Sequence, residues 1–259
     1  MAIQDILKGT AYGRYEQKLE KEVKQGRIPK HVAVIMDGNR RYAEETLKAD
    51  ITQGHLKGKE KLEEMLDWCV DLGVRVITVY AFSTENFSRK EEEVEFLMDL
   101  LERTLIDFSK DERIHRNRVK LKVIGDISMM PDNVAEAVRH AEESTSGYSE
   151  FYLNMAIAYS GRQEIRDAIR NIAQKVKCDE LKIEDISESL ISDHMYSPGL
   201  PDPDLVLRTS GELRVSNFLL WQLAYSELYF ADVYWPGFRK MDFMRAIRSY
   251  QQRSRRFGQ

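Results

Sequence analysis

Hydrophobic positions along the chain form short continuous runs that alternate with longer stretches of helical periodicity. The runs are rich in β-branched and aromatic residues and span residues 31–36, 74–81, 119–124, 151–157 and 205–207. Apolar strands that are separated by helices are typical of a parallel sheet covered on both faces. The pattern therefore predicts an α/β domain with a mainly parallel central sheet flanked by helices.

Apolar residues with helical spacing occupy the stretches between these runs. In residues 57–72, for example, Leu62, Met65 and Cys69 fall on one face of a helix. Further helices are predicted over residues 94–108, 131–141, 161–177 and 241–257. We expect residues 1–30 to be an N-terminal helical appendage, residues 31–259 to be one domain without linkers or repeats, and the charged last helix to be a second appendage.

Composition restricts the partners of the chain. Its 259 residues include 39 Lys+Arg and 43 Asp+Glu, which gives a net charge of −4. A chain of this length can bury one sizeable core, and its slightly negative charge offers no general attraction to nucleic acid. Nucleic acid is therefore not an expected partner, and an anion site has to be a local cluster of arginines.

The expected location is the reducing cytoplasm. No run of about 18 apolar residues predicts a membrane-spanning helix, and the first residues lack the basic and apolar regions of a signal peptide. The two cysteines, Cys69 and Cys178, lie far apart in the sequence. Such spacing suggests neither a disulfide framework nor a zinc site.

Polar residues follow the first predicted strand directly. Asp37 and Gly38 precede two guanidinium groups, Arg40 and Arg41, and a helix is expected to begin near Ala43. In open α/β sheets ligands bind beyond the carboxyl ends of the strands, and a carboxylate with arginines there can hold Mg²⁺ and a diphosphate. The alternative is a simple turn with solvated arginines, which a preceding buried parallel strand disfavours.

A second polar cluster follows residues 74–81. Ser83, Asn86 and Arg89 come before the charged residues 90–93, and this stretch predicts a mobile loop that closes over a substrate. The alternative is an N-capping segment for the next helix. His55 is likewise open to two interpretations, because a lone histidine at a helix start is a cap or core group as readily as a phosphate donor.

A third cluster surrounds the last predicted strand. Arg208 ends that strand, and Arg214 and Ser216 follow a short turn that contains glycine. Two arginines can each make bidentate contacts to a diphosphate. Further on, Glu227 lies in an apolar segment predicted as a core helix, where a metal ion shared with Asp37 would compensate its charge. The alternative for Glu227 is a structural Arg–Glu pair in the core.

Four blocks of sequence together resemble the signatures of the cis-prenyltransferases, the family of undecaprenyl and dehydrodolichyl diphosphate synthases. The blocks span residues 31–43, 54–58, 80–87 and 208–230. Motifs of P-loop NTPases, common dinucleotide enzymes and zinc proteases do not occur in the sequence. The resemblance implies an enzyme that condenses isopentenyl diphosphate with an allylic prenyl diphosphate to a (poly)cis-prenyl diphosphate for a lipid carrier.

The same resemblance implies Mg²⁺ as cofactor, a homodimer with a hydrophobic tunnel, and peripheral membrane contact during product release. By position, Asp37 and Glu227 are the implied Mg²⁺ ligands, with Glu227 donated across the dimer, and Asn86 assists proton removal or orients the departing diphosphate. Arg208, Arg214 and Ser216 match the isopentenyl diphosphate site. The residues implied to bind the substrates are Gly38, Asn39, Arg40, Arg41, Tyr42, His55, Ser83, Thr84, Glu85, Phe87, Arg89, Arg208, Arg214, Val215 and Ser216.

One position departs from the family pattern. Ile51 stands where an arginine commonly helps to bind the allylic diphosphate. Loss of a charge-assisted hydrogen bond costs roughly 1.5 to 3 kcal/mol unless another group compensates, and Arg40 is the candidate for that role. Leu97, Leu101 and Leu105 are candidates for limiting the length of the tunnel, or are ordinary core residues.

Other functions remain open at this point. Ile51 leaves room for prenyl transfer to an unusual acceptor or for a non-head-to-tail condensation. A noncatalytic subunit of a heteromeric prenyltransferase and a polyprenyl diphosphate carrier are disfavoured. A subunit of that kind typically lacks the catalytic aspartate or the late arginines, whereas this chain keeps Asp37, Arg208 and Arg214, and a carrier needs no metal ligands.

Overall fold

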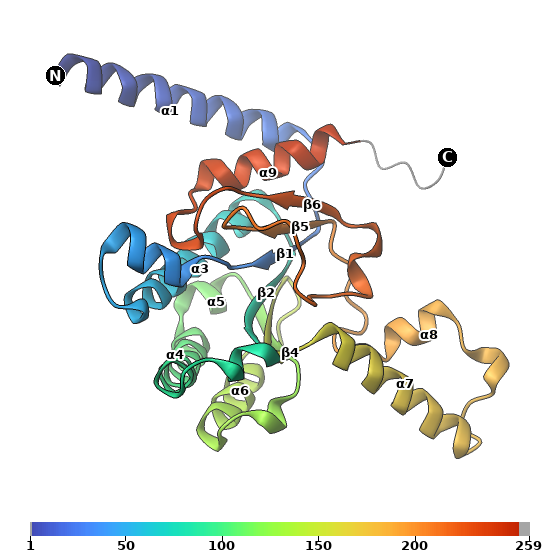
Figure 1. The fold of residues 1–259 in the computed structure, drawn as a ribbon. Helices are drawn as coiled ribbons and strands as arrows, with labels where there is room; N and C mark the ends of the chain where they lie inside the picture. The colour runs from blue at the N-terminus through green and yellow to red at the C-terminus, as the bar shows by residue number, and fades with distance from the viewer. Residues whose placement is uncertain (1, 254–259) are drawn as a thin grey trace.

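A six-stranded sheet forms the centre of the molecule in the computed structural model, which describes residues 2–253, with side chains from residue 13 onward (Figure 1). The strand order is β3-β4-β2-β1-β5-β6, and every neighbouring pair is parallel. The strands are β1 (His31–Ile35), β2 (Val76–Ser83), β3 (Val119–Ile124), β4 (Phe151–Tyr159), β5 (Leu205–Arg208) and β6 (Glu227–Phe230). The predicted α/β fold is confirmed, with β6 as an additional strand.

Helices occupy most of the connections. They are α1 (Ala2–Gln25), α2 (Asn39–Arg41), α3 (Ile51–Leu72), α4 (Glu91–Lys110), α5 (Glu112–Arg116), α6 (Asp132–Ser144), α7 (Gly161–Lys177), α8 (Glu188–Asp193) and α9 (Lys240–Gln252). α3 begins earlier than predicted because the Asp50 side chain caps it, accepting a hydrogen bond from the Thr52 amide at 2.9 Å. In the described part of the chain, no helix combines the length and apolar character of a membrane span.

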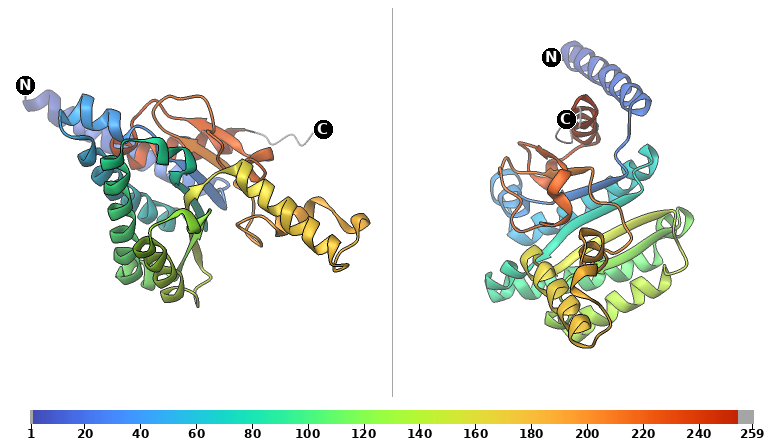
Figure 2. Two further views of the ribbon diagram at one scale, coloured as in Figure 1. Left: turned by 60° about the horizontal axis from the view of Figure 1, so that its bottom comes forward. Right: turned by 90° about the vertical axis from the view of Figure 1, so that its right-hand side faces the viewer.

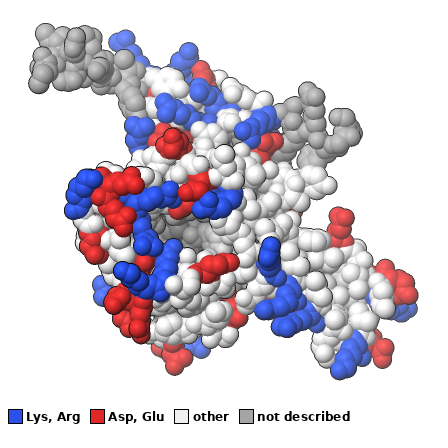
Figure 3. Space-filling view, in the orientation of Figure 1, with Lys and Arg blue, Asp and Glu red and all other residues white. Residues whose placement is uncertain are grey.

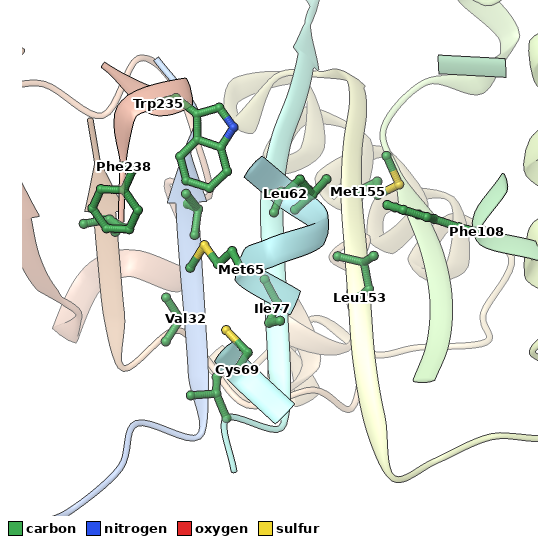
Figure 4. Packing of buried hydrophobic residues seen from close by; sticks show 14 of the residues in the cluster. Val32, Leu62, Met65, Cys69, Ile77, Phe108, Leu153, Met155, Trp235 and Phe238 are labelled. Carbon is green, nitrogen blue, oxygen red and sulfur yellow. The ribbon is translucent and has the colours of Figure 1, made fainter. Parts of the chain in front are cut away.

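The two faces of the sheet carry different layers. Val32 of β1 packs in a large apolar cluster with residues of α3, α4, α6 and α9, and Figure 4 shows Met65 of α3 beside this strand. Ile35 points to the other face, as strand alternation requires, and packs in a smaller cluster with Phe218 from the segment between β5 and β6. α7 and α8 extend away from the sheet (Figures 1 and 2).

The last helix, α9, belongs to the core. Phe243, Met244 and Ile247 are fully buried, so the prediction that this helix is an appendage is wrong. Its charged residues occupy the outer face, which conceals the apolar face that packs on the sheet. Leu19 and Val23 in the second half of α1 are buried against it, whereas the beginning of α1 extends away from the body (Figure 1). Positions 254–257 of the predicted helix lie outside the described residues.

A buried histidine in β1 predicts acid sensitivity. His31 places Nδ1 2.7 Å from the Pro201 carbonyl oxygen and Nε2 2.8 Å from Thr78 Oγ1. Burial lowers the pKa of His31 to about 4, although the Pro201 carbonyl and Asp204 oppose the shift. In the unfolded chain a histidine titrates near 6.5.

Because the unfolded state binds this proton first, the His31 contribution is complete above about pH 6.5 and falls as the pH drops towards 4. We expect the loss to total about 3 kcal/mol of the free energy of unfolding, measured by urea denaturation between pH 7.5 and 4. His31→Gln, which does not titrate, should show a correspondingly flatter profile. Identical pH profiles for both proteins would contradict the prediction.

Candidate active site

The Asp37 carboxylate lies just beyond β1, at the carboxyl end of the sheet. Oδ1 accepts a hydrogen bond from Arg41 Nη2 at 3.2 Å, and Oδ2 accepts one from Arg208 Nη2 at 2.7 Å. Burial alone would raise the pKa of Asp37. Hydrogen bonds from Arg208 and Ser210, with the charges of Arg208 and Arg41, outweigh burial and hold this pKa below its usual range. Asp37 is therefore ionised at neutral pH.

The turn after β1 is fixed by its neighbours. Thr209, fully buried after β5, accepts a hydrogen bond from the Asp37 amide at 3.0 Å and donates one to the Asp37 carbonyl at 2.6 Å. Gly38 has a φ of 100°, and a Cβ there would lie 2.7 Å from Tyr234. The chain then enters α2 and a π-helical turn (Tyr42–Leu47), so helical structure begins at Asn39, earlier than the expected start near Ala43.

Asn39 is held against α3 by close backbone contact. A Cβ on Gly54 would lie 2.0 Å from the Asn39 carbonyl oxygen, and one on Gly58 would lie 2.6 Å from Asn39 Oδ1. This Oδ1 atom is buried and has no hydrogen-bond partner. An unpaired buried acceptor costs about 1–3 kcal/mol, and Asn39 as a residue lines both the polar and the apolar cavities.

Three basic side chains converge on Glu93 of α4. The carboxylate accepts a hydrogen bond from Arg89 Nη1 at 2.8 Å, and it lies 3.3 Å from His55 Nε2 and 3.7 Å from Arg40 Nη1. The expectation of a mobile charged loop is wrong for Glu93, because this residue is only 4% exposed. Burial lowers the pKa of His55, against the influence of Glu93, so the imidazole is mainly neutral at pH 7.

The segment after β2 is a capped turn. Asn86 Oδ1 accepts a hydrogen bond from the Ser83 amide at 2.9 Å across the short 3-10 helix Thr84–Ser88. The prediction that this segment caps the helix beginning near Glu91 is wrong, because the N-cap of α4 is Lys90, and Ser83 and Asn86 instead cap their own 3-10 turn. The engaged amide oxygen of Asn86 is unsuited to accept a proton.

Arg208 ends β5 with only 5% of its side chain exposed. Besides binding Asp37, its Nη1 donates to the Arg214 carbonyl oxygen at 2.6 Å and to Ser216 Oγ at 2.7 Å. The Arg208 guanidinium therefore shapes the loop that carries the other two residues. The Arg214 side chain is 60% exposed and pairs with Glu212, so its charge faces the open part of the site.

Most of the predicted site residues line two adjoining polar cavities of about 270 and 250 Å³. They are Asp37, Gly38, Asn39, Arg40, Arg41, His55, Ser83, Asn86, Arg89, Arg208, Arg214 and Ser216. Figure 3 shows acidic and basic side chains gathered around a hollow in one face of the molecule. The geometry suits an anion that carries two phosphate groups.

An apolar cavity of about 80 Å³ continues from the polar ones between α3 and α4. It shares five lining residues with the polar cavity of about 250 Å³, namely Met36, Asn39, His55, Ala81 and Leu97. An anion site that opens into an apolar space fits an amphiphile such as a prenyl diphosphate.

Comparisons with known proteins agree with this geometry. The family model for undecaprenyl diphosphate synthase matches residues 35–258. The chain is 51% identical to a tritrans,polycis-undecaprenyl-diphosphate synthase (geranylgeranyl-diphosphate specific) from Thermoplasma volcanium, over 100% of both chains. An enzyme of the same name from Methanocaldococcus jannaschii is 54% identical over 94% of this chain and 88% of its own.

The chain belongs to the undecaprenyl diphosphate synthase family. A solved structure of lavandulyl diphosphate synthase from Lavandula x intermedia, in complex with dimethylallyl diphosphate, superposes with a TM-score of 0.85. It shares 35% sequence identity and covers 92% of this chain and 100% of its own. This cis-prenyltransferase is therefore a transferase of prenyl groups, as the sequence blocks predicted.

Some residues implied by the resemblance lie outside the polar cavities. They are Tyr42, Thr84, Glu85, Phe87, Val215 and Glu227. Phe87 packs edge-on against Phe82 with ring centroids 4.9 Å apart, and Val215 joins the smaller apolar cluster. Glu85 accepts a hydrogen bond from Asn217 at 3.3 Å, which links the β2 turn to the loop after β5. In this structure these three residues support the site from outside the cavities.

Glu227 lies at the wrong end of the sheet to share a metal ion with Asp37 of the same chain. It begins β6 level with Val32 of β1, whereas Asp37 lies beyond the opposite end of β1, more than about 10 Å away along the strand direction. Its carboxylate pairs with Arg253 at 2.9 Å, so an Arg–Glu pair exists, but at the partly exposed edge of the sheet. The prediction that this apolar segment is a core helix is wrong, since Leu219 has a left-handed φ of 44°, Gln222–Tyr225 form only a 3-10 turn, and Glu227 begins a strand.

The site also contains residues that sequence reasoning missed. Ser210 Oγ accepts a hydrogen bond from Arg41 Nη2 at 3.0 Å, and Glu212 Oε1 accepts one from Arg41 Nη1 at 3.3 Å. Ser210 and Glu212 lie between Arg208 and Arg214 in the sequence, and this position was the signal that could have identified them. There was no such signal for Glu93, because it is one of three consecutive glutamates.

Proposed function

We propose that this cis-prenyltransferase extends geranylgeranyl diphosphate with isopentenyl diphosphate to a long-chain polyprenyl diphosphate. The observation that carries the proposal is the continuity of the polar cavities at Asp37 and Arg208 with the apolar cavity between α3 and α4. The printed names of the relatives that are 51% and 54% identical favour geranylgeranyl diphosphate as the primer.

The residues at the end of β1 fit Mg²⁺ as the cofactor. Mg²⁺ is usually bound by one or two carboxylates together with substrate phosphates, and it prefers oxygen ligands. A carboxylate offers about four acceptor positions, and Asp37 uses three of them for Arg41, Arg208 and Ser210, so a lone pair remains for a metal ion. Asn39, an amide with an unpaired Oδ1, lines the same polar cavities. Asp37 would hold the ion, which supplies charge neutralisation for a leaving diphosphate.

The arginines divide between two diphosphate groups in this proposal. Arg40, Arg41 and Arg89 surround the cavity at Asp37, where they bind the allylic diphosphate and stabilise the charge that develops as its C–O bond breaks. Arg40 thereby replaces the arginine that the family commonly has at Ile51. Arg208, Arg214 and Ser216 would hold isopentenyl diphosphate, and Asn86 would orient the departing group.

A homodimer and transient membrane contact complete the proposal. Within one chain Glu227 is remote from Asp37, so its role as a metal ligand requires a second copy that brings its β6 edge to this site. We also propose contact with a membrane surface during product release, because a long polyprenyl product is insoluble in water. The proposed location of the enzyme is the cytoplasm. A solution mass measurement of the purified chain tests the dimer.

The decisive assay uses purified chain, Mg²⁺, labelled isopentenyl diphosphate and primers from dimethylallyl to geranylgeranyl diphosphate. We expect butanol-extractable label, with the highest kcat/KM for geranylgeranyl diphosphate and none after chelation of the metal. A parallel reaction with labelled dimethylallyl diphosphate and no isopentenyl diphosphate tests the non-head-to-tail alternative, which extractable label would favour. Activity that appears only when a second protein is added would instead identify a noncatalytic subunit.

A further inference from the structure

One charged side chain borders the apolar cavity. In the described structure the cavity is lined mainly by apolar residues of α3 and α4, including Leu62, Leu97 and Leu101, and by Met155 and Trp235, three of which are labelled in Figure 4. Leu105, a sequence candidate for the tunnel, is fully buried in the core and does not line the cavity.

That charged residue is Lys59 of α3. Its Nζ lies 2.6 Å from Asp107 Oδ2 on α4 and 3.4 Å from Glu63 Oε1, one turn further along α3. Burial alone would lower the pKa of Lys59, but its hydrogen bond to Asp107 and the nearby acidic charges raise it, so the amine is protonated. The methylene stem can therefore border the apolar cavity while the ammonium group ties α3 to α4.

The cavity is small for the substrate that it is proposed to take. Its volume is about 80 Å³, whereas an engineered apolar cavity of about 150 Å³ holds a molecule no larger than benzene. A chain of several five-carbon units needs far more room. The seam between α3 and α4 therefore has to widen as the product grows, and the Lys59–Asp107 pair opposes that widening.

We propose that Lys59 and Asp107 form a latch between α3 and α4 that sets product length. This inference rests on the proposed function of the same site. Each added unit competes with product release, and extension past the latch requires the ion pair to open. Because Lys59 is 22% and Asp107 56% exposed, the pair has the strength of a partly exposed ion pair. It therefore shifts the distribution of chain lengths without deciding whether product forms.

The test compares chain-length distributions for the full chain with geranylgeranyl diphosphate, labelled isopentenyl diphosphate and Mg²⁺. Lys59→Met keeps the apolar stem of the side chain and removes its positive charge. Asp107→Asn keeps the shape of the partner side chain and removes its negative charge. The quantity measured is the amount of products longer than the main wild-type product, divided by the amount of that main product. In each variant this ratio should rise about two- to fivefold. The double variant should show no further rise, since the two charges act as one pair.

Lys57→Met is the matched control. It breaks the Lys57–Glu60 pair (2.6 Å) on the same helix, at a residue that does not line the cavity, so the distribution should stay unchanged. An unchanged distribution in both latch variants, an equal shift in the control, or additive effects in the double variant would overturn the latch. Asp107 is exposed, so Asp107→Asn keeps the test decisive if Lys59→Met folds poorly.

Failure of the latch and failure of the proposed function give different results in this assay. No labelled product from the wild-type chain would contradict the proposed function, and the latch with it. A normal wild-type distribution that neither latch variant changes would contradict the latch alone.

Discussion

Replacing Asp37 with alanine should abolish prenyl transfer, lowering kcat/KM by on the order of 10³-fold or more. In our proposal this carboxylate holds Mg²⁺ against the leaving diphosphate, and metal stabilisation of such charge contributes several kcal/mol to catalysis. The substitution also leaves Arg208, which is almost fully buried, without its acidic partner. Initial rates of isopentenyl diphosphate incorporation at several Mg²⁺ concentrations measure the effect.

Two further variants separate the chemistry at Asp37 from stability. Asp37→Asn keeps an oxygen that can accept a hydrogen bond from Arg208 but removes the charge, so it should fold and still lack activity. Glu45→Gln removes a carboxylate that bonds the Tyr234 hydroxyl at 2.7 Å outside the polar cavities, and its rate should equal that of the wild type. Near wild-type turnover by Asp37→Asn would remove Asp37 from the metal role.

Replacing Arg208 with methionine should affect both activity and stability. The guanidinium binds Asp37 and the loop that carries Arg214 and Ser216, so its loss leaves a half-buried carboxylate with Arg41 as its remaining cation. We expect the free energy of unfolding to fall by about 2–3 kcal/mol, below the full cost of breaking a buried pair because Asp37 is partly exposed. We also expect kcat/KM to fall about 10²-fold or more.

Arg214→Met provides the contrast for this second prediction. The Arg214 side chain is 60% exposed, so its replacement should change stability by no more than about 0.5 kcal/mol. The KM for isopentenyl diphosphate should rise about tenfold or more, since one charge-assisted contact to the diphosphate is lost. Urea denaturation and steady-state kinetics on both variants distinguish the two roles. Equal losses of stability in both would contradict the structural role of Arg208.

The strand pattern predicted much of the site because parallel strands end at one edge of the sheet. Asp37, Ser83 and Arg208 each follow a different predicted strand, and the structure brings all three to the lining of one polar cavity. This part of the site could be predicted without the family resemblance, from the general rule that ligands bind beyond the carboxyl ends of strands in open α/β sheets.

The local sequence pattern gave wrong predictions where charged residues belong to buried parts of the structure. Glu93 stands in a run of three glutamates that looks like a solvated surface, yet it is buried beneath three basic groups. The charged last helix looked like an appendage, yet its inner face is core. Arg40 and His55, which meet Glu93, and the core residues that α9 packs against all come from distant parts of the chain, which the local sequence does not record.

The sequence by itself determined the first five strands, the main helices between them, the mainly parallel sheet and the polar residues that follow β1, β2 and β5, because these follow from local hydrophobic periodicity. Only the tertiary structure decided which strand ends meet. β5 pairs with β1, which joins Arg208 to Asp37 across 171 positions, and the same pairing leaves Glu227 at the far end. Only the tertiary structure also decided the width of the seam between α3 and α4, since side-chain packing between the two helices sets the volume of the cavity.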